Sequence, residues 1–236
     1  MKDGYKQVEP ALRALVDPKK AAFQKTFFKT GEGQYGAEDK FLGVMVPDVR
    51  TLVPRFQHLP LSDCARLLES PYNEVRLLAL CILVAQYKGG APAEKSAIYK
   101  AYLANLKGVN NWNLVDASAH YIMGAHLLEK DKKILLKLSK SRNLWERRVA
   151  IVATWAFIRA GLYDHTLELS AALLKDNEDL MHKACGWMLR EVGKKDVSVL
   201  ENFLKEHHAD MPRTMLRYAI EKFPPARRKK MLKGVF

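Results

Sequence analysis

The sequence has few of the residues that build covalent or metal-based frameworks. Among its 236 residues are three cysteines, Cys64, Cys81 and Cys185, which are scattered and form no CxxC pair. A disulfide framework, a zinc ribbon and a four-cysteine iron–sulfur cluster are therefore excluded, and a reducing compartment fits best. No apolar run approaches the roughly 18 residues of a membrane span. The first residues also lack the apolar core of a signal peptide, so we expect a cytoplasmic protein.

Motifs for metals and nucleotides are also missing. The seven histidines are scattered, and His120 and His126 are six residues apart, which does not suit a metal site on one helix face. The segment Gly31–Gly36 matches GxGxxG, but no strand precedes it as dinucleotide binding requires. We interpret it as a long loop that ends near Pro47, where a helix begins. The sequence therefore predicts no metal ion and no cofactor.

Strand-like runs of alternating Val and Ile are absent, whereas apolar residues recur at helical spacing nearly everywhere. Asn110, Asn111, Asn143 and Asn177 are placed as N-caps. Glycines placed as helix stops are Gly31, Gly89, Gly90, Gly108, Gly161 and Gly193. Together these signals predict an all-α chain.

Five segments resemble one another and predict a helical repeat. Their second positions are Arg76, Trp112, Arg148, Lys183 and Arg217, at intervals of 36, 36, 35 and 34 residues. A period near 35 in an all-helical chain indicates stacked helix pairs, that is, an α-solenoid of HEAT-like repeats. Stacking would align these residues in one column, on a basic concave face of a curved chain. The alternative is that Arg only packs between repeats, and for Arg76 the two interpretations are evenly balanced.

The charge of +13 points to a polyanionic partner. Residues 1–70, 71–140 and 141–236 carry net charges of +2, +5 and +6, so the excess is no basic tail on a neutral domain. It favours nucleic acid or another anionic surface. The alternative is a basic surface that serves only solubility.

One carboxylate interrupts this basic pattern. Asp116 lies four residues after Trp112, Trp187 lies four after Lys183, and Arg190 lies three after Trp187, so each pair shares a helix face. A carboxylate in a phosphate-binding groove would repel the ligand, which suggests chemistry or recognition of a cation. The alternatives are a half-buried packing role for Trp112 and an ion pair of Asp116 with Arg148. The remaining tryptophans, Trp145 and Trp155, are expected in the core.

Four segments resemble, in order and spacing, motifs of the AlkD family of bacterial HEAT-like DNA alkylation repair glycosylases. Asn111–Asp116 resembles its Trp-x-x-x-Asp motif, and Trp145–Ile151 its Trp-x-x-Arg-x-Ala-Ile segment. Gly186–Glu191 resembles Gly-Trp-x-Leu-Arg-Glu, and Phe41–Val44 with Pro47 resembles the N-terminal Phe-Leu-Gly-Ile and Pro.

The resemblance implies a solenoid, with residues 1–236 as one domain, that holds duplex DNA and excises N3- and N7-alkylated purines. It implies that Asp116 is the catalytic carboxylate, that Trp112 and Trp187 are aromatic walls beside the lesion, and that Arg148 and Arg190 contact the backbone. Lys183 and Arg217, from the repeat pattern, are further predicted DNA contacts. The expected protein is a bacterial monomer that binds alkylated double-stranded DNA.

Two other functions stay open at this point. A DNA-binding protein of the same fold could sense damage without catalysis, and a HEAT-type scaffold could bind proteins instead. The combination of Trp112, Asp116 and Trp187 favours a monofunctional glycosylase, because a scaffold does not need a carboxylate between tryptophans on a basic face.

Overall fold

Every regular element of the computed structural model, which describes residues 4–236, is helical. Among these residues one isolated bridge joins Lys40 to Tyr72, and there is no strand. The all-α class predicted by the periodicity is confirmed. The contacts divide the chain into two compact units with the boundary after His126. That residues 1–236 act as one domain stays a prediction.

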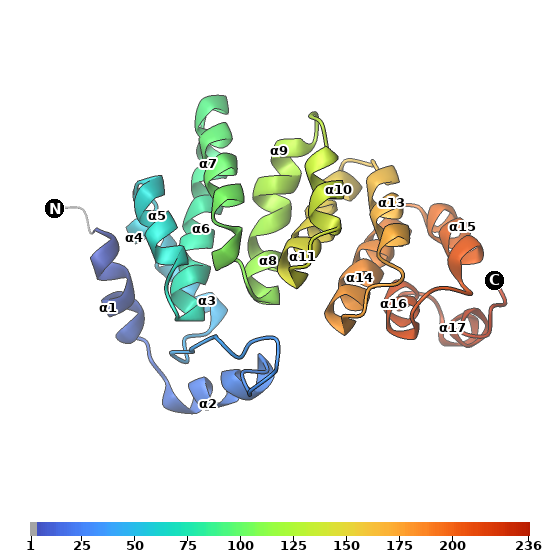
Figure 1. The fold of residues 1–236 in the computed structure, drawn as a ribbon, viewed down its shortest axis with the longest axis horizontal. Helices are drawn as coiled ribbons and strands as arrows, with labels where there is room; N and C mark the ends of the chain where they lie inside the picture. The colour runs from blue at the N-terminus through green and yellow to red at the C-terminus, as the bar shows by residue number, and fades with distance from the viewer. Residues whose placement is uncertain (1–3) are drawn as a thin grey trace. The chain divides into compact units, whose positions relative to one another are not determined.

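The N-terminal unit is built around α6, which packs against α1, α3, α4, α5, α7 and α8. Because other helices surround α6, most of its residues are buried, and its apolar residues lie on all sides of the helix. The helices of this unit are α1 (Val8–Arg13), α2 (Pro18–Phe27), α3 (Val46–Thr51), α4 (Val53–Phe56), α5 (Leu61–Leu68), α6 (Asn73–Gly89), α7 (Pro92–Ala104), α8 (Trp112–Ala119) and α9 (Ala125–Leu127), which reaches the boundary (Figure 1). Short turns at Tyr5–Gln7 and Leu106–Gly108 are 3₁₀-helical.

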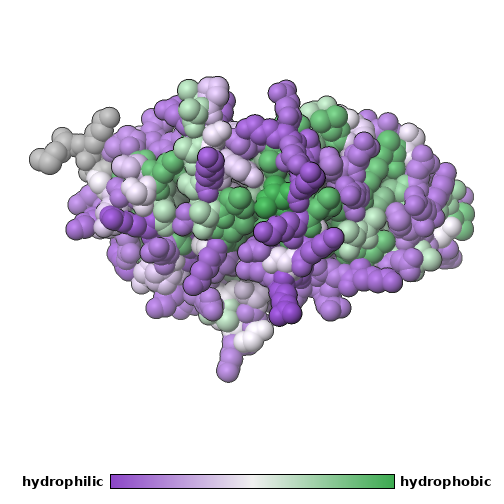
Figure 2. All heavy atoms as spheres, turned by 45° about the horizontal axis from the view of Figure 1, so that its top comes forward, coloured by the Kyte–Doolittle hydropathy of each residue, from purple (hydrophilic) through white to green (hydrophobic). Residues whose placement is uncertain are grey.

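The C-terminal unit is built in the same way around α14, which packs against α11, α12, α13, α15 and α16. Its helices are α10 (Lys133–Ser139), α11 (Leu144–Ala153), α12 (Trp155–Arg159), α13 (Asp164–Ala172), α14 (Asp179–Lys195), α15 (Val197–His207), α16 (Arg213–Ala219) and α17 (Pro225–Met231). On the face shown in Figure 2, hydrophilic residues cover most of the surface, and patches of apolar residues show between them.

The five repeated segments fall on α6, α8, α11, α14 and α16, each preceded by a partner helix. These second helices pack on one another within each unit: α6 on α8, α11 on α14, and α14 on α16. The predicted helix pairs are therefore confirmed. The predicted curvature and basic concave face stay predictions.

Several helix boundaries follow the expected caps. Asn111 caps α8 and Asn143 caps α11, each through its side-chain oxygen. The prediction for Asn177 is wrong, since the N-cap of α14 is Glu178, and Asp176 accepts its backbone N–H. Gly90 and Gly161 follow helix ends as expected, but Gly193 lies inside α14. The helix continues past Gly193 to Lys195, and the missing side chain of Gly193 makes room for Leu200.

All three cysteines are free thiols, and Cys64 and Cys185 are buried. Burial raises the pKa of Cys64 to about 12, so this thiol stays protonated and unreactive at neutral pH. No helix within residues 4–236 is long and apolar enough to cross a membrane.

Candidate functional site

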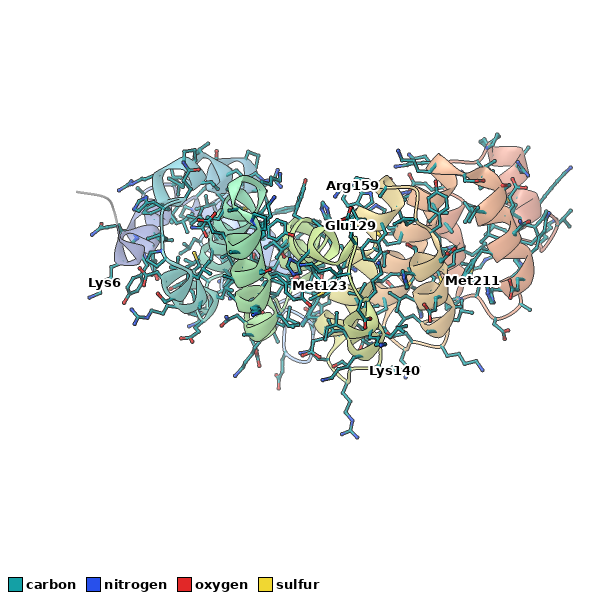
Figure 3. All side chains as sticks on the ribbon, turned by 90° about the horizontal axis from the view of Figure 1, so that it is seen from above. Lys6, Met123, Glu129, Lys140, Arg159 and Met211 are labelled. Carbon is teal, nitrogen blue, oxygen red and sulfur yellow. The ribbon has the colours of Figure 1, made fainter. Side chains whose placement is uncertain are left out.

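Trp112 and Asp116 lie one turn apart on α8, and both are half-buried. The helix begins at Trp112 because the side-chain oxygen of Asn111 accepts the Trp112 backbone N–H at 2.7 Å. Beyond Ala119 the backbone widens into a π-helical segment, His120–Gly124, in which Met123 is fully buried (Figure 3). π-helical turns are frequent at functional sites, so this one is consistent with a functional role for the preceding turn, which carries Asp116.

The indole of Trp112 is held by phenylalanines that sequence analysis did not single out. Phe28 stacks on it with ring centroids 4.9 Å apart and planes 17° apart. Phe27 contacts it edge-on at 5.7 Å and 73°. Phe28 is buried and stacks in turn on Phe41 at 4.7 Å. The half-buried state of Trp112 thus comes from an aromatic stack that fixes the ring and leaves part of it open.

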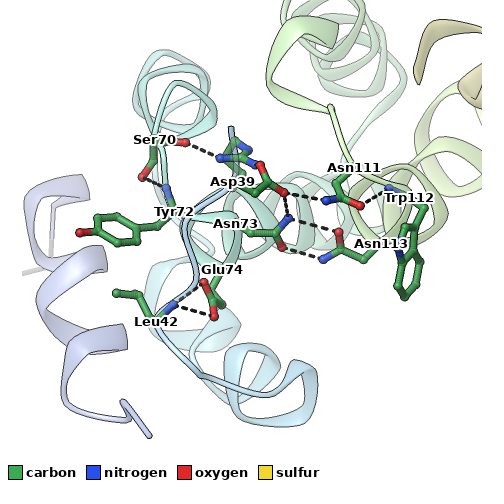
Figure 4. Close-up of polar contacts among 10 residues, drawn as sticks. Asp39, Leu42, Ser70, Tyr72, Asn73, Glu74, Asn111, Trp112 and Asn113 are labelled. Atoms are coloured by element: carbon green, nitrogen blue, oxygen red, sulfur yellow. Dashed lines mark hydrogen bonds and ion pairs between the residues drawn. The ribbon is translucent and has the colours of Figure 1, made fainter. Parts of the chain in front are cut away.

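A buried polar network fixes the start of α8 (Figure 4). Asp39 accepts hydrogen bonds from Asn111 Nδ2 at 2.7 Å and from Asn73 Nδ2 at 2.8 Å, and it forms an ion pair with Arg76. Asn73 and Asn113 exchange amide hydrogen bonds at 2.7 and 3.3 Å. This network ties the loop after α2 to the first turns of α6 and α8, so it orients the residue that caps the Trp112 end of the helix.

The loop between α2 and α3 contains the GxGxxG match. A helix and not a strand precedes it, so it does not form the strand–turn–helix motif that binds phosphate. Gly36 passes so close to the Phe28 carbonyl that a Cβ would overlap it. Further along, the Glu74 carboxylate accepts backbone N–H groups of Leu42, Gly43 and Val44 at 3.0–3.3 Å. Burial raises the pKa of Glu74, and these three donors partly offset that effect. The loop is therefore a scaffold beside Trp112.

The negative charge of Asp116 affects the protonation of the Tyr102 hydroxyl. Burial raises the pKa of the Tyr102 hydroxyl, and the negative charge of Asp116 raises it further. Tyr102 is therefore neutral at physiological pH, and its hydroxyl shares a hydrogen bond of 3.0 Å with Ser118. A negative charge on a half-buried helix face, with the neutral Tyr102 near it, suits the stabilisation of a positive charge that approaches from outside.

The C-terminal unit has a second aromatic group around Trp187 on α14. Trp155 contacts Trp187 edge-on, with centroids 5.1 Å apart and planes 64° apart. The exposed Arg159 guanidinium lies 5.3 Å from the Trp155 ring centroid. Trp145 is buried as predicted, but the prediction of a core position for Trp155 is wrong, because it is half-buried beside Trp187. Spacing along the chain carries no signal for this pair, which forms between α12 and α14.

The predicted column of basic residues is not uniform. Arg76 is buried and bonded to Asp39, so the packing interpretation is correct for it. Its contacts recur at Arg147, which donates to the carbonyl six residues earlier and pairs with Asp176 at 2.6 Å. The equivalence of Arg76 with Arg148 is therefore wrong by one residue.

Arg148 itself is 5% exposed and donates to the Leu180 carbonyl at 2.7 Å, which ties α11 to α14. At the other predicted positions the cations are more open. Lys183 is half-buried with an ion pair to Asp179 at 2.7 Å, and Arg217 is exposed. Arg190 is half-buried and forms an ion pair with Glu221. Of the predicted DNA contacts in this unit, Lys183, Arg190 and Arg217 are therefore at least partly exposed, whereas Arg148 is buried.

Gly186, directly before Trp187, lies where α14 packs tightly against α16. A Cβ there would lie 2.5 Å from Tyr218 Cβ and closer than van der Waals contact to the Met215 carbonyl. We expect Gly186→Ala to lower the free energy of unfolding by about 1–3 kcal/mol, as overpacked cores do. Chemical denaturation measures this. Gly89→Ala, at a helical glycine with open space around it, is the control and is expected to leave stability unchanged or slightly raised. Equal stability of the two variants would contradict the close helix contact.

Within the described residues, no group of three or more His, Cys, Asp or Glu side chains is arranged to hold a metal ion. The groups described above are a carboxylate and an indole ring in the N-terminal unit, and an indole ring with cationic side chains in the C-terminal unit. None of these needs a cofactor to stabilise or attract charge.

The fold and these residues define the class of protein: it is an all-α protein of stacked helix pairs. One helix carries a carboxylate one turn from a tryptophan, and other helices carry solvent-accessible cationic side chains. A model of the family "DNA alkylation repair enzyme" matches residues 8–223, and the chain belongs to this family. The resemblance seen in the sequence motifs is thereby confirmed.

Among solved structures, the chain is similar to a predicted DNA alkylation repair enzyme from Enterococcus faecalis. The two share 17% sequence identity with a TM-score of 0.68, over 89% of this chain and 97% of that one. At this identity the likeness shows the fold. No curated protein matches the chain.

Proposed function

We propose that the protein is a monofunctional DNA glycosylase that hydrolyses the N-glycosidic bond of cationic N3- and N7-alkylpurines, such as 3-methyladenine and 7-methylguanine, in duplex DNA. The observation that carries the proposal is the Trp112–Asp116 turn of α8, held by the Asn111 cap and the Phe28 stack, in a chain of the DNA alkylation repair enzyme family. We further propose that the protein acts as a monomer in the cytoplasm.

Asp116 is proposed as the catalytic carboxylate. An alkylated purine already carries a positive charge, so its bond to C1′ breaks with the electron pair leaving on the base, and no acid is needed to protonate it. The sugar becomes oxocarbenium-like, which a nearby carboxylate stabilises. Water then adds to C1′, and Asp116 accepts its proton as general base. The products are the free base and an abasic site, with the strand intact because no nucleophilic lysine takes part.

Trp112 and Trp187 are proposed as aromatic walls. Each cation–π contact with the charged lesion contributes about 0.5–2 kcal/mol. The contact weakens when the lesion is neutral, so the selection depends on charge and bond lability. Trp155 supports Trp187 by its edge-on contact in the same unit.

Lys183, Arg190 and Arg217 are proposed to bind phosphates, and Arg148 to support them by holding α11 against α14. Arg190 would exchange its Glu221 partner for phosphate, which is feasible because Glu221 is 42% exposed on the surface. Such contacts release counterions, so affinity for DNA is expected to fall steeply with salt.

The direct test is release of 7-methylguanine from methylated duplex DNA by the purified protein, followed by chromatography of the free base. We expect release from methylated DNA and none above background from duplexes that contain hypoxanthine, whose glycosidic bond is not weakened by charge. Binding without release would show a non-catalytic damage sensor. Weak binding that does not respond to salt would instead show a protein scaffold, and efficient hypoxanthine excision would contradict selection by charge.

A further inference from the structure

Helix α2 carries two phenylalanines, Phe23 and Phe27, that stay largely exposed. Phe23 and Phe27 are 60% and 51% exposed, although large apolar side chains are normally buried. They lie four residues apart, so they share one face of the helix. Their rings stack with centroids 5.6 Å apart and planes 18° apart. Two aligned and open ring faces form an ordered apolar surface rather than a scattered exposure.

This surface continues into the proposed catalytic turn within the same unit. Phe27 contacts both Trp112 and Phe28 edge-on, at 5.7 and 5.2 Å. Phe28 lies buried beneath Trp112. A line of rings therefore runs from Phe23 through Phe27 to Trp112, and its open end is Phe23.

The charges around these rings favour a polyanion. Lys19 and Lys20 precede Phe23 by four and three residues, which places them on the same side of α2, one turn away. Both are exposed, as are Lys25 and Lys29, and α2 contains no acidic residue. Asp17 stabilises the first turn by accepting the backbone N–H groups of Lys19 and Lys20 at 2.9 and 3.3 Å. The helix that presents the rings is thus capped at its first turn.

We propose that Phe23 and Phe27 form a stacking platform for a DNA base that lies outside the duplex stack, with Lys19 and Lys20 on the adjacent phosphates. The inference rests on the proposed function insofar as DNA is the ligand. Bases within a duplex hide their faces against their neighbours, so a bulged, mismatched or single-stranded base is what an open phenyl ring can stack on. Phenyl rings carry no hydrogen-bonding group, so the platform reads the displacement of a base and not its identity.

The test uses the full chain and two fluorescein-labelled duplexes without methylation, one fully paired and one with a single-nucleotide bulge. We expect tighter binding of the bulged duplex by wild type, measured by fluorescence anisotropy at one salt concentration. Phe23→Leu removes the ring while keeping an apolar helix former, and we expect it to reduce the affinity for the bulge about fivefold or more without changing that for the paired duplex. Phe23→Trp is expected to restore the preference.

A 2-aminopurine placed in the bulge gives a second readout, since stacking on the platform changes its fluorescence in wild type and in Phe23→Trp but not in Phe23→Leu. Leu162→Ala, which truncates a side chain of 48% exposure in the C-terminal unit, is the matched control and should bind as wild type. Unchanged bulge affinity in Phe23→Leu overturns the proposal. So does a change in the oligomeric state of Phe23→Leu with no effect on DNA, because the rings would then serve contact between copies.

This outcome is separable from that of the proposed function, since the duplexes contain no lesion. A protein that releases no methylated base but loses bulge preference in Phe23→Leu would refute the glycosylase and support the platform. Release of 7-methylguanine with no bulge preference would do the reverse.

Discussion

Replacing Asp116 by Asn is expected to lower the single-turnover rate of 7-methylguanine release by about 100- to 10,000-fold. Asn has the same size as Asp but carries no negative charge and accepts no proton. It therefore can neither stabilise an oxocarbenium-like sugar nor activate water in the proposed mechanism. The rate is measured with excess protein over methylated duplex, so that product release does not limit it.

The affinity for DNA should not fall together with this rate. Removing a carboxylate from a surface that approaches phosphates reduces repulsion, so Asp116→Asn is expected to bind DNA as tightly as wild type or tighter. Asp131→Asn, at a 63% exposed carboxylate in the C-terminal unit, is the control and should keep the wild-type rate. Equal rates for Asp116→Asn and wild type would remove Asp116 from the mechanism.

The second large effect concerns stability: Asp39→Ala is expected to lower the free energy of unfolding by about 3–5 kcal/mol. The side chains of Arg76 and Asp39 are 4% and 2% exposed, so the substitution leaves a buried guanidinium without its carboxylate. It also removes the acceptor of the Asn73 and Asn111 amides. Urea denaturation followed by circular dichroism measures the loss.

Two comparison variants make this prediction specific. Glu9→Ala breaks an ion pair with Arg13 whose side chains are 39% and 48% exposed, so it should lower the free energy of unfolding far less than Asp39→Ala does. The double variant Asp39→Ala with Arg76→Met removes both buried charges and is expected to recover part of the stability. A loss no larger than that of Glu9→Ala would show that the buried pair does not hold the loop on α6.

Local patterns of the sequence predict the elements well, because helix periodicity and caps depend on residues a few positions apart. Asn111 and Asn143 cap helices as expected, and the period near 35 correctly marks the second helix of each pair. The prediction that Asn177 caps a helix is wrong, also for a local reason. The carboxylate of Asp176, one residue earlier, accepts the backbone N–H of Glu178 at the start of α14.

The same patterns do not decide which cations are buried. Arg148 and Arg217 occupy similar repeat positions, yet the first is buried against the Leu180 carbonyl and the second is exposed. The difference depends on which helix lies beside each residue. One-residue shifts such as that between Arg147 and Arg148 turn the side chain by about 100° around the helix. The contacts of Arg147 with Asp176 and Ser141 therefore could not be assigned from spacing alone.

The sequence by itself determined the all-α class, the helix pairs, the family motifs, and the placement of Trp112 and Asp116 one turn apart, because each of these is encoded in short-range spacing or in ordered motifs. Only the tertiary structure decided what holds that turn. Phe28 reaches Trp112 across 84 positions of the chain, and Asp39 reaches Asn111 across 72. Contacts at such separations arise when the loop after α2 folds back onto α6 and α8. Stacking and buried hydrogen bonds then select partners by their geometry in space, which the order of residues does not show.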